Sequence, residues 1–127
     1  MLPIQPPNRN ILLVYNNVDN REMLTQVLSF EGYHLDEVED GSAAISYLQS
    51  NSPPCLILLN IDELDAIEDQ FPGTSSIPIV AITEGGRKRK HRGADAYFTK
   101  PLDYDLLLNT ICVLISSKSV KKAFSTA

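Results

Sequence analysis

The sequence predicts an α/β sandwich in which a parallel sheet of five strands is covered by helices on both faces. Three observations predict this class: continuous apolar runs at 11–14, 55–59 and 77–82, helical patterns between the runs, and turn residues at the junctions. Continuous runs of this length fit strands that are buried on both faces. Strands that alternate with helices are joined by right-handed crossovers, which makes the sheet parallel and doubly wound.

The first half of the chain contains two strand–helix units. After the run at 11–14, Asp19 or Asn20 is a suitable cap for a helix, and Gly32 is a suitable residue to end it. The expected inner face of this helix comprises Met23, Leu24, Val27 and Leu28. A second strand at 33–38 leads through an Asp-Gly turn to a second helix. Its expected inner face comprises Ala43, Ala44, Tyr47 and Leu48.

The second half of the chain offers less helix. Only a short helix fits at 63–71, because a Pro-Gly-Thr-Ser-Ser segment follows it, and the segment 84–93 has adjacent glycines and no apolar stripe. We therefore expect shortened third and fourth crossover helices. A fifth strand at 96–99 precedes a final helix that Asp103 or Asp105 would open. The expected inner face of the final helix comprises Leu106, Leu107, Thr110, Ile111, Leu114 and Ile115.

Length and composition indicate one compact domain. The chain has 127 residues, of which 43% are hydrophobic, enough for one core. We place the domain at 10–116, between an N-terminal extension at 1–9 and a polar tail or linker at 117–127. The net charge of -5 argues against general affinity for nucleic acid. No apolar run approaches the roughly 20 residues of a membrane span, and residues 1–8 lack the layout of a secretory signal, so we expect a cytoplasmic protein.

The two cysteines carry little functional information. Cys55 and Cys112 lie in apolar runs and lack the spacing of metal ligands. We expect each to be a buried free thiol.

Several segments, in their order and spacing, are similar to a bacterial response-regulator receiver domain. They begin at Ile11 (ILLVYNNVDNR), Glu31 (EGY), Leu56 (LILLN), Ile82 (IT) and Ala94 (ADAYFTKP). The most specific part is the Lys-Pro pair that follows the aromatic strand. The resemblance implies a flavodoxin-like fold with the strand order 2-1-3-4-5, and a cis bond before the proline.

The resemblance also assigns roles to particular positions. In this family an acidic pair after the first strand binds magnesium, and an aspartate at the end of the third strand accepts a phosphoryl group. A hydroxyl and a lysine after the next two strands contact the phosphate, and an aromatic residue near the lysine changes rotamer on activation. In that order, the positions fall on Tyr15 and Asn16, Asn60, Thr83, Lys100, and Tyr97.

The three carboxylates that the family uses are therefore missing. A carboxamide lacks the charge and the nucleophilic oxygen from which an acyl phosphate forms, so Asn60 is not expected to accept a phosphoryl group. Magnesium is a hard cation that prefers carboxylates, and Tyr15 adds bulk instead. We expect a degenerate receiver, or pseudo-receiver, that catalyses no reaction, binds no cofactor and has lost magnesium binding.

These expectations favour a phosphorylation-independent protein-binding module in two-component signal transduction or a phosphorelay. Its partner would be a signalling protein or an output domain, with a homodimer as a further option. The expected partner surface comprises Arg87, Lys88, Arg89, Lys90, Arg92, Tyr97 and Tyr104. Nucleic acid is a weaker candidate, because no aromatic residues interleave with the basic cluster to stack on bases.

Two alternatives remain open. The crevice around Lys100 and Thr83 could sense an anion or small ligand, since the lysine has lost its carboxylate partners. Alternatively, Asp62 or Asp65, on the loop beyond Asn60, could act as a displaced phosphoryl acceptor. As turn or helix-cap residues, the two aspartates have a simpler structural explanation.

Overall fold

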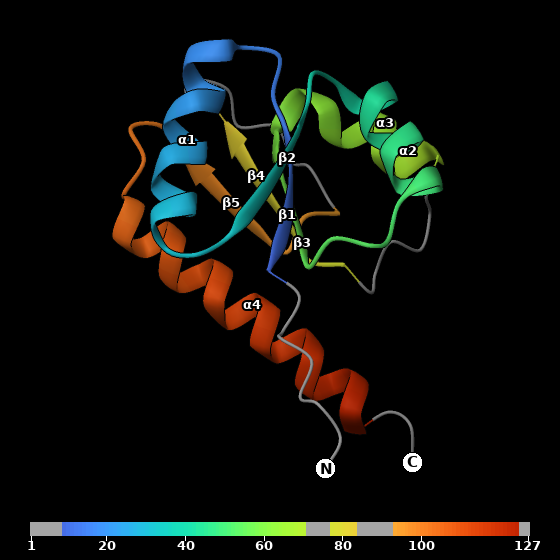
Figure 1. Cartoon of the computed structure of the whole chain (residues 1–127), viewed down its shortest axis with the longest axis vertical. Helices are drawn as coiled ribbons and strands as arrows, with labels where there is room; N and C mark the ends of the chain where they lie inside the picture. Colours follow the sequence, from blue (N-terminus) through green and yellow to red (C-terminus); the bar gives the residue numbers. More distant parts are fainter. Residues whose placement is uncertain (1–8, 71–76, 84–92, 125–127) are drawn as a thin grey trace.

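The computed structural model describes residues 9–70, 77–83 and 93–124, and it shows a five-stranded parallel sheet between two helical layers (Figure 1). The strands are β1 (Asn10–Val14), β2 (His34–Val38), β3 (Leu56–Asn60), β4 (Ile79–Thr83) and β5 (Ala96–Thr99). The helices are α1 (Val18–Phe30), α2 (Gly41–Ser50), α3 (Leu64–Gln70) and α4 (Tyr104–Phe124), with a 3-10 turn at Ile61–Glu63. The strand order β2-β1-β3-β4-β5 confirms the predicted flavodoxin-like topology.

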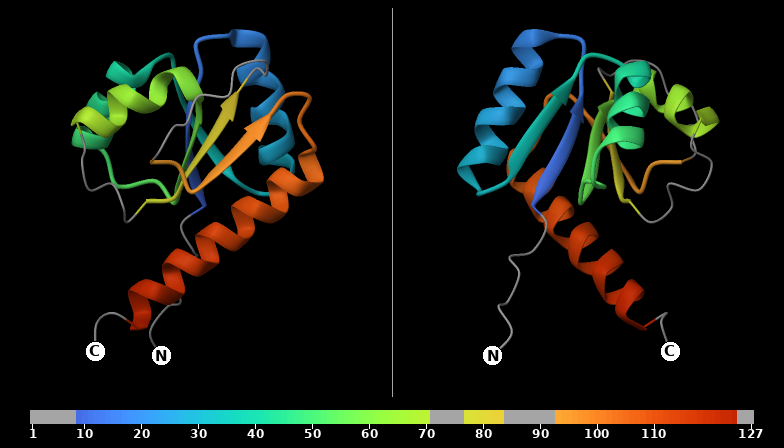
Figure 2. Two further views of the ribbon diagram at one scale, coloured as in Figure 1. Left: turned by 180° about the vertical axis from the view of Figure 1, so that it is seen from behind. Right: turned by 45° about the vertical axis from the view of Figure 1, so that its right-hand side comes forward.

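The core consists of two clusters, one on each face of the sheet. Because side chains alternate along a strand, Ile11 and Leu13 of β1 pack in the cluster that includes α1 and α4, whereas Leu12 and Val14 pack in the cluster that includes α2 and α3. Figure 2 shows these two pairs of helices on opposite faces of the sheet. All four side chains are fully buried. Burial on both faces explains why the central strands are continuous apolar runs.

Helix α1 differs from its prediction at its start and on its inner face. The amide of Arg21 donates to the carbonyl of Asn17 at 3.0 Å, so the helix begins before Asp19 and the predicted cap at Asp19 or Asn20 is wrong. Met23, expected on the inner face, is 55% exposed. Its neighbour Leu24 and, one turn later, Leu28 are fully buried, so the buried stripe is narrower than predicted.

Helix α1 ends where the sequence predicts. Gly32 has a φ of 91°, a left-handed conformation that glycine adopts without strain. Arg9 closes this end of the helix, because its guanidinium donates to the carbonyls of Glu31 at 2.9 Å and Gly32 at 3.1 Å. The same guanidinium stacks over the ring of Tyr33, 4.4 Å from the ring centroid. The start of β1 is thereby tied to the end of α1.

The N-terminus of α2 packs closely against the segment after β3. Asp40 caps the helix, with Oδ1 accepting from the amide of Ala43 at 2.8 Å. The amide of Gly41 donates to Oε2 of Glu63 at 2.8 Å. A Cβ at Gly41 would lie 2.8 Å from the Cβ of Ala66, so this close approach requires glycine.

The third crossover is short, as predicted, and the last helix is longer than predicted. Helix α3 has seven residues, and residues 84–92 of the fourth crossover lie outside the described part of the chain. Helix α4 continues to Phe124, so the polar tail or linker expected from residue 117 is helical over most of its length. Among the described helices, none is both long enough and apolar enough to cross a membrane.

One face of α4 packs on the sheet. Leu107 and Ile111 are fully buried, whereas Leu106, which was expected on the inner face, is 54% exposed, so that part of the prediction is wrong. Oδ1 of Asp103 accepts from the amide of Leu106 at 3.1 Å, which selects Asp103 as the cap. Cys112 is exposed and Cys55 is half-buried, both as free thiols. The expected burial of Cys112 is wrong, because the residue lies about 100° around the helix from Ile111.

Candidate functional site

The candidate site lies at the carboxyl ends of the strands, where the strand order reverses. β1 lies between β2 and β3, and the helices that follow β1 and β2 cover opposite faces of the sheet (Figure 2). A sheet of this kind leaves a crevice at such a point. Tyr15, Asn60, Thr83 and Lys100 all lie at this edge, because each ends a strand or directly follows one.

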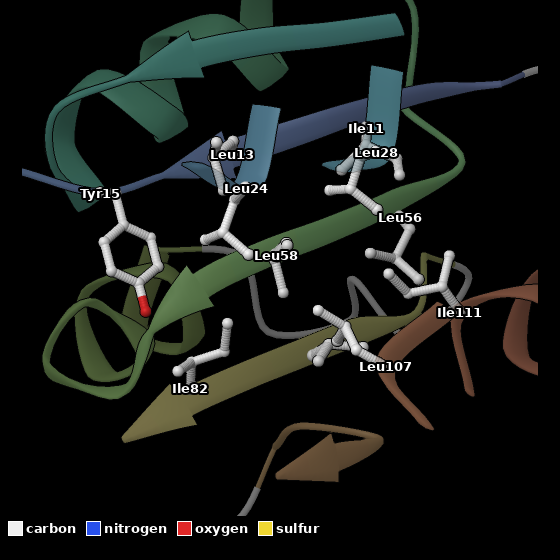
Figure 3. Packing of buried hydrophobic residues seen from close by; sticks show 11 residues of the cluster. Ile11, Leu13, Tyr15, Leu24, Leu28, Leu56, Leu58, Ile82, Leu107 and Ile111 are labelled. Atoms are coloured by element: carbon white, nitrogen blue, oxygen red, sulfur yellow. The ribbon is translucent and has the colours of Figure 1, made fainter. Parts of the chain in front are cut away.

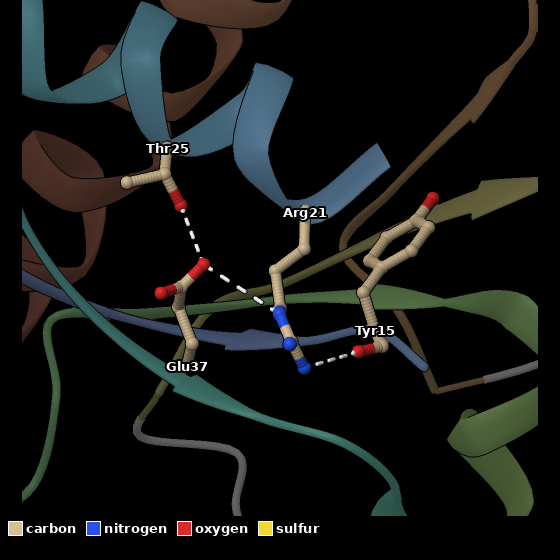
Figure 4. Close-up of polar contacts among 4 residues, drawn as sticks. All are labelled: Tyr15, Arg21, Thr25 and Glu37. Atoms are coloured by element: carbon tan, nitrogen blue, oxygen red, sulfur yellow. Dashed lines mark hydrogen bonds and ion pairs between the residues drawn. The ribbon is translucent and has the colours of Figure 1, made fainter. Parts of the chain in front are cut away.

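The side chain of Tyr15 is turned into the core. It is fully buried in the cluster that faces α1 and α4 (Figure 3). Its amide donates to the carbonyl of Val38 at 3.0 Å, and its carbonyl accepts from Nη1 of Arg21 at 3.1 Å (Figure 4). Arg21 also pairs with Glu37, with 3.6 Å between Nε and Oε1, and the same Oε1 accepts from the hydroxyl of Thr25 at 3.0 Å. The polar network on α1 and β2 thus holds the backbone of Tyr15.

Asn60 is built into the turn that follows β3. Its half-buried side chain caps the 3-10 turn at Ile61–Glu63, with Oδ1 accepting from the amide of Asp62 at 3.1 Å. Asp62 and Asp65 are both exposed in the turns that follow. The side-chain carboxamide of Asn60 therefore has a structural role, as the cap of this turn.

Lys100 lies close to Tyr15, although the two residues follow different strands. Its amide donates to the carbonyl of Thr83 at 3.0 Å, and the bond to Pro101 is cis, as the resemblance implied. Nζ of Lys100 lies 5.7 Å from the centroid of the Tyr15 ring, within the range of a cation–π contact. Thr83 and Lys100 are both half-buried.

The donor groups at this edge do not fit a magnesium ion. Asn16 is exposed and neutral, the buried Tyr15 offers a phenol, and the Oδ1 of Asn60 accepts a backbone hydrogen bond. Magnesium in proteins is held by one or two carboxylates in near-ideal octahedral geometry. Over the described residues, no three His, Cys, Asp or Glu side chains are grouped to hold a metal ion.

The predicted partner surface is described only in part. Tyr97 is 44% exposed on β5, and its hydroxyl accepts from the amide of Ala94 at 3.2 Å. Tyr104 is half-buried and packs against the core. The basic residues at 87–92 lie outside the described residues.

Sequence reasoning missed two residues that shape this region. One is Arg21, which binds the backbone of Tyr15 and is one of two basic residues among the first 60, a rarity that could have drawn attention to it. The other is Asp95, whose Oδ2 accepts from the amide of Ile79 at 2.8 Å and whose amide donates to the Ile79 carbonyl at 2.7 Å. Both contacts involve backbone groups, which leave no pattern in the sequence.

Comparison with known proteins shows that the chain is similar to one part of response regulators. No family model matches the sequence. The response regulator MprA of Mycobacterium tuberculosis is 32% identical over 114 residues, which cover 83% of this chain and 50% of MprA. MprA of Mycobacterium avium is 31% identical over the same length and the same shares. The chain thus spans about half the length of the curated relatives that it matches.

Solved structures give the same result. NtrX from Brucella abortus, in complex with ADP, is 25% identical with a TM-score of 0.82 over 92% of this chain and 28% of NtrX. The receiver domain of a histidine kinase from Syntrophus aciditrophicus is 25% identical with a TM-score of 0.75, over 85% of this chain and 90% of that domain. A CheY-like receiver from Methanospirillum hungatei, 20% identical with a TM-score of 0.78 over 91% of this chain and 99% of that chain, shares the fold. Sequence similarity, strand order and fold together identify the chain as a response-regulator receiver domain.

Proposed function

We propose that this receiver domain signals by binding a protein partner and accepts no phosphoryl group. One observation carries the proposal: the three positions at which the receiver family has carboxylates hold Tyr15, Asn16 and Asn60. In this proposal the domain is a pseudo-receiver, neither an enzyme nor a magnesium protein, and its active conformation is fixed by packing.

The chemistry at Asn60 supports the loss of phosphoryl transfer. Formation of an acyl phosphate needs an anionic carboxylate oxygen as the nucleophile, and a carboxamide has none. The Asn60 side chain also caps the turn that leads to Asp62, so it is held by the backbone on the exposed side of the strand end. The side-chain carboxamide of Asn60 acts as a turn cap, a role that a carboxylate could also perform.

The proposed partner surface runs along β5 and the adjoining part of α4. Tyr97 of β5 is well exposed, and on α4 Leu106 and Val113 are 54% and 64% exposed. Aromatic side chains are enriched at the cores of protein interfaces, so Tyr97 is the proposed centre of this surface and the two aliphatic side chains add apolar area around it. The sequence segment 87–92 is basic, and we propose that its charge attracts an acidic signalling protein or output domain.

Intact mass spectrometry after incubation with acetyl phosphate and magnesium tests the proposal. The wild-type mass is expected to be unchanged, and the Asn60→Asp variant is expected to gain little, because Tyr15 and Asn16 still supply no carboxylate at the two positions where the family binds magnesium. An ordinary receiver treated in parallel shows that the reagent is active.

A labile phosphoryl adduct on the wild type would contradict the proposal. Asp62→Asn and Asp65→Asn variants would then locate the acceptor. A separate titration with inorganic phosphate alone, followed by the amide resonances of Thr83 and Lys100, is expected to cause no shift. Saturable shifts would instead favour an anion sensor.

A further inference from the structure

The Tyr15 and Lys100 side chains meet across the sheet. β1 and β5 are separated by β3 and β4, and neighbouring strands lie about 4.8 Å apart, which puts the backbones of β1 and β5 roughly 14 Å apart. Nζ of Lys100 nevertheless lies 5.7 Å from the centroid of the Tyr15 ring. The two side chains must therefore extend toward each other over the carboxyl ends of β3 and β4, where Asn60 and Thr83 lie.

The Tyr15 ring fills space at this edge of the sheet. The side chain is 0% exposed and belongs to the same core cluster as Leu58 of β3 and Ile82 of β4. Figure 3 shows the ring descending from the end of β1 beside the carboxyl end of β3. Protein interiors are packed with few voids larger than a water molecule. The Tyr15 ring therefore takes up space at the carboxyl ends of β1 and β3 that a smaller side chain would leave free.

The backbone of Tyr15, from which the ring extends, is held by hydrogen bonds on both sides. The Tyr15 amide continues the pairing of β1 with β2 through Val38, and the Tyr15 carbonyl is held by Arg21. Arg21 is in turn paired with Glu37 (Figure 4). These contacts hold the Tyr15 backbone, from which the ring extends, and turning the buried ring out of the core would expose a large apolar surface to water.

We infer that Tyr15 is a built-in plug: its ring, braced by Lys100, closes the crevice to a phosphoryl group and to magnesium by filling space, independently of the charges lost at Asn16 and Asn60. This inference rests on the proposed function and gives it a steric cause. Restoring the carboxylates at positions 16 and 60 does not reopen the crevice while the aromatic ring is present.

Two variants of equal charge distinguish the effect of the size of side chain 15 from the effect of its chemical groups. In an Asn16→Asp/Asn60→Asp background, Tyr15→Leu shortens the side chain and keeps it apolar, whereas Tyr15→Phe keeps the ring. Neither side chain offers a metal ligand. The probe is magnesium with beryllofluoride, followed by the amide resonances of residues 60, 83 and 100. The affinity of the leucine variant for magnesium is expected to be about tenfold higher, or more, than that of the phenylalanine variant.

Equal magnesium affinity of the leucine and phenylalanine variants would overturn the plug, as would tight binding by the background that retains Tyr15. That background leaves the core unchanged, so it provides a measurement even where the leucine variant fails to fold. In it, nuclear Overhauser contacts between the Tyr15 ring and the Lys100 side chain are expected to persist at saturating magnesium and beryllofluoride. Their loss on binding would also overturn the plug. Phosphorylation of the wild type would contradict the proposed function separately, because no variant is involved in that test.

Discussion

The carboxyl ends of β1 and β3 are adjacent in the sheet, and each lacks the carboxylate that receivers carry there, but they have changed in different ways. Tyr15, after β1, is fully buried and is part of the core. Asn60, at the end of β3, is half-buried and caps a turn. The change at β3 alters chemistry while keeping shape, whereas the change at β1 alters packing. A single substitution can reverse the first, but reversing the second requires rebuilding the core.

The largest expected effect is at the β1 end. Tyr15→Ala removes a fully buried aromatic side chain, and such truncations cost about 3–5 kcal/mol of unfolding free energy. Urea denaturation measures the loss, with Asn16→Ala as the control, because Asn16 is an exposed neighbour. A loss no larger than that of Asn16→Ala would break the distinction between the two strand ends.

The next effect concerns the support of the β3 end. Gly41→Ala places a Cβ 2.8 Å from the Cβ of Ala66 and 3.3 Å from Oε2 of Glu63, which follows Asn60 in the 3-10 turn. Overpacking of this kind costs about 1–3 kcal/mol. Ser42→Ala, at an exposed position of the same helix, is expected to leave the urea midpoint nearly unchanged. If both variants behave alike, the close packing of α2 against the β3 turn is not required.

Substitutions at Asn60 sharpen the comparison directly. Asn60→Ala removes the acceptor for the amide of Asp62, and loss of a cap costs about 1 kcal/mol. Asn60→Asp keeps an acceptor oxygen and is expected to retain wild-type stability. Thermal unfolding of the pair gives the comparison, and an aspartate variant as unstable as the alanine variant would show that the cap needs the amide.

The smallest effect is expected from the ion pair that braces the β1 end. Glu37→Gln removes the charge opposite Arg21, at a pair that is 3.6 Å apart and partly exposed. Partly exposed pairs contribute about 0.2–1 kcal/mol, and salt screens them. Unfolding at low and high salt is expected to show a small difference from wild type that shrinks as salt rises. A difference that grows with salt would mean that the contact is not electrostatic.

The central sheet could be predicted because burial leaves a pattern in the sequence. Side chains such as Leu12 and Leu13 point to opposite faces and are both apolar because both faces are covered. The end of α1 was equally clear, since Gly32 adopts a backbone conformation that other residues resist.

Other features left a weaker or misleading pattern. The sequence after Ile115 is mostly polar and basic, so no regular apolar stripe predicts that α4 continues to Phe124. The start of α1 was predicted two or three residues late. The first helical hydrogen bond is accepted by the backbone carbonyl of Asn17, and because every residue has such a carbonyl, the sequence does not mark this position.

The candidate site was predicted in position and not in arrangement. Chain order and strand ends bring Tyr15, Asn60, Thr83 and Lys100 to one edge of the sheet, and this follows from topology. The Tyr15 ring turns into the core and approaches Lys100 across the ends of two intervening strands, β3 and β4. Both features depend on how the side chains pack. Residue types at strand ends do not specify such a contact, because a tyrosine there can equally point into solvent.

The most direct test of the account is a two-dimensional amide NMR spectrum of the wild-type protein, recorded with magnesium alone, beryllofluoride alone, and both together. The account predicts no saturable shift at Asn60, Thr83 or Lys100 that requires both reagents. Such a shift, spreading to Tyr97 and α4, would contradict it, because it would show a crevice that still accepts a phosphoryl mimic and transmits its presence to the partner surface.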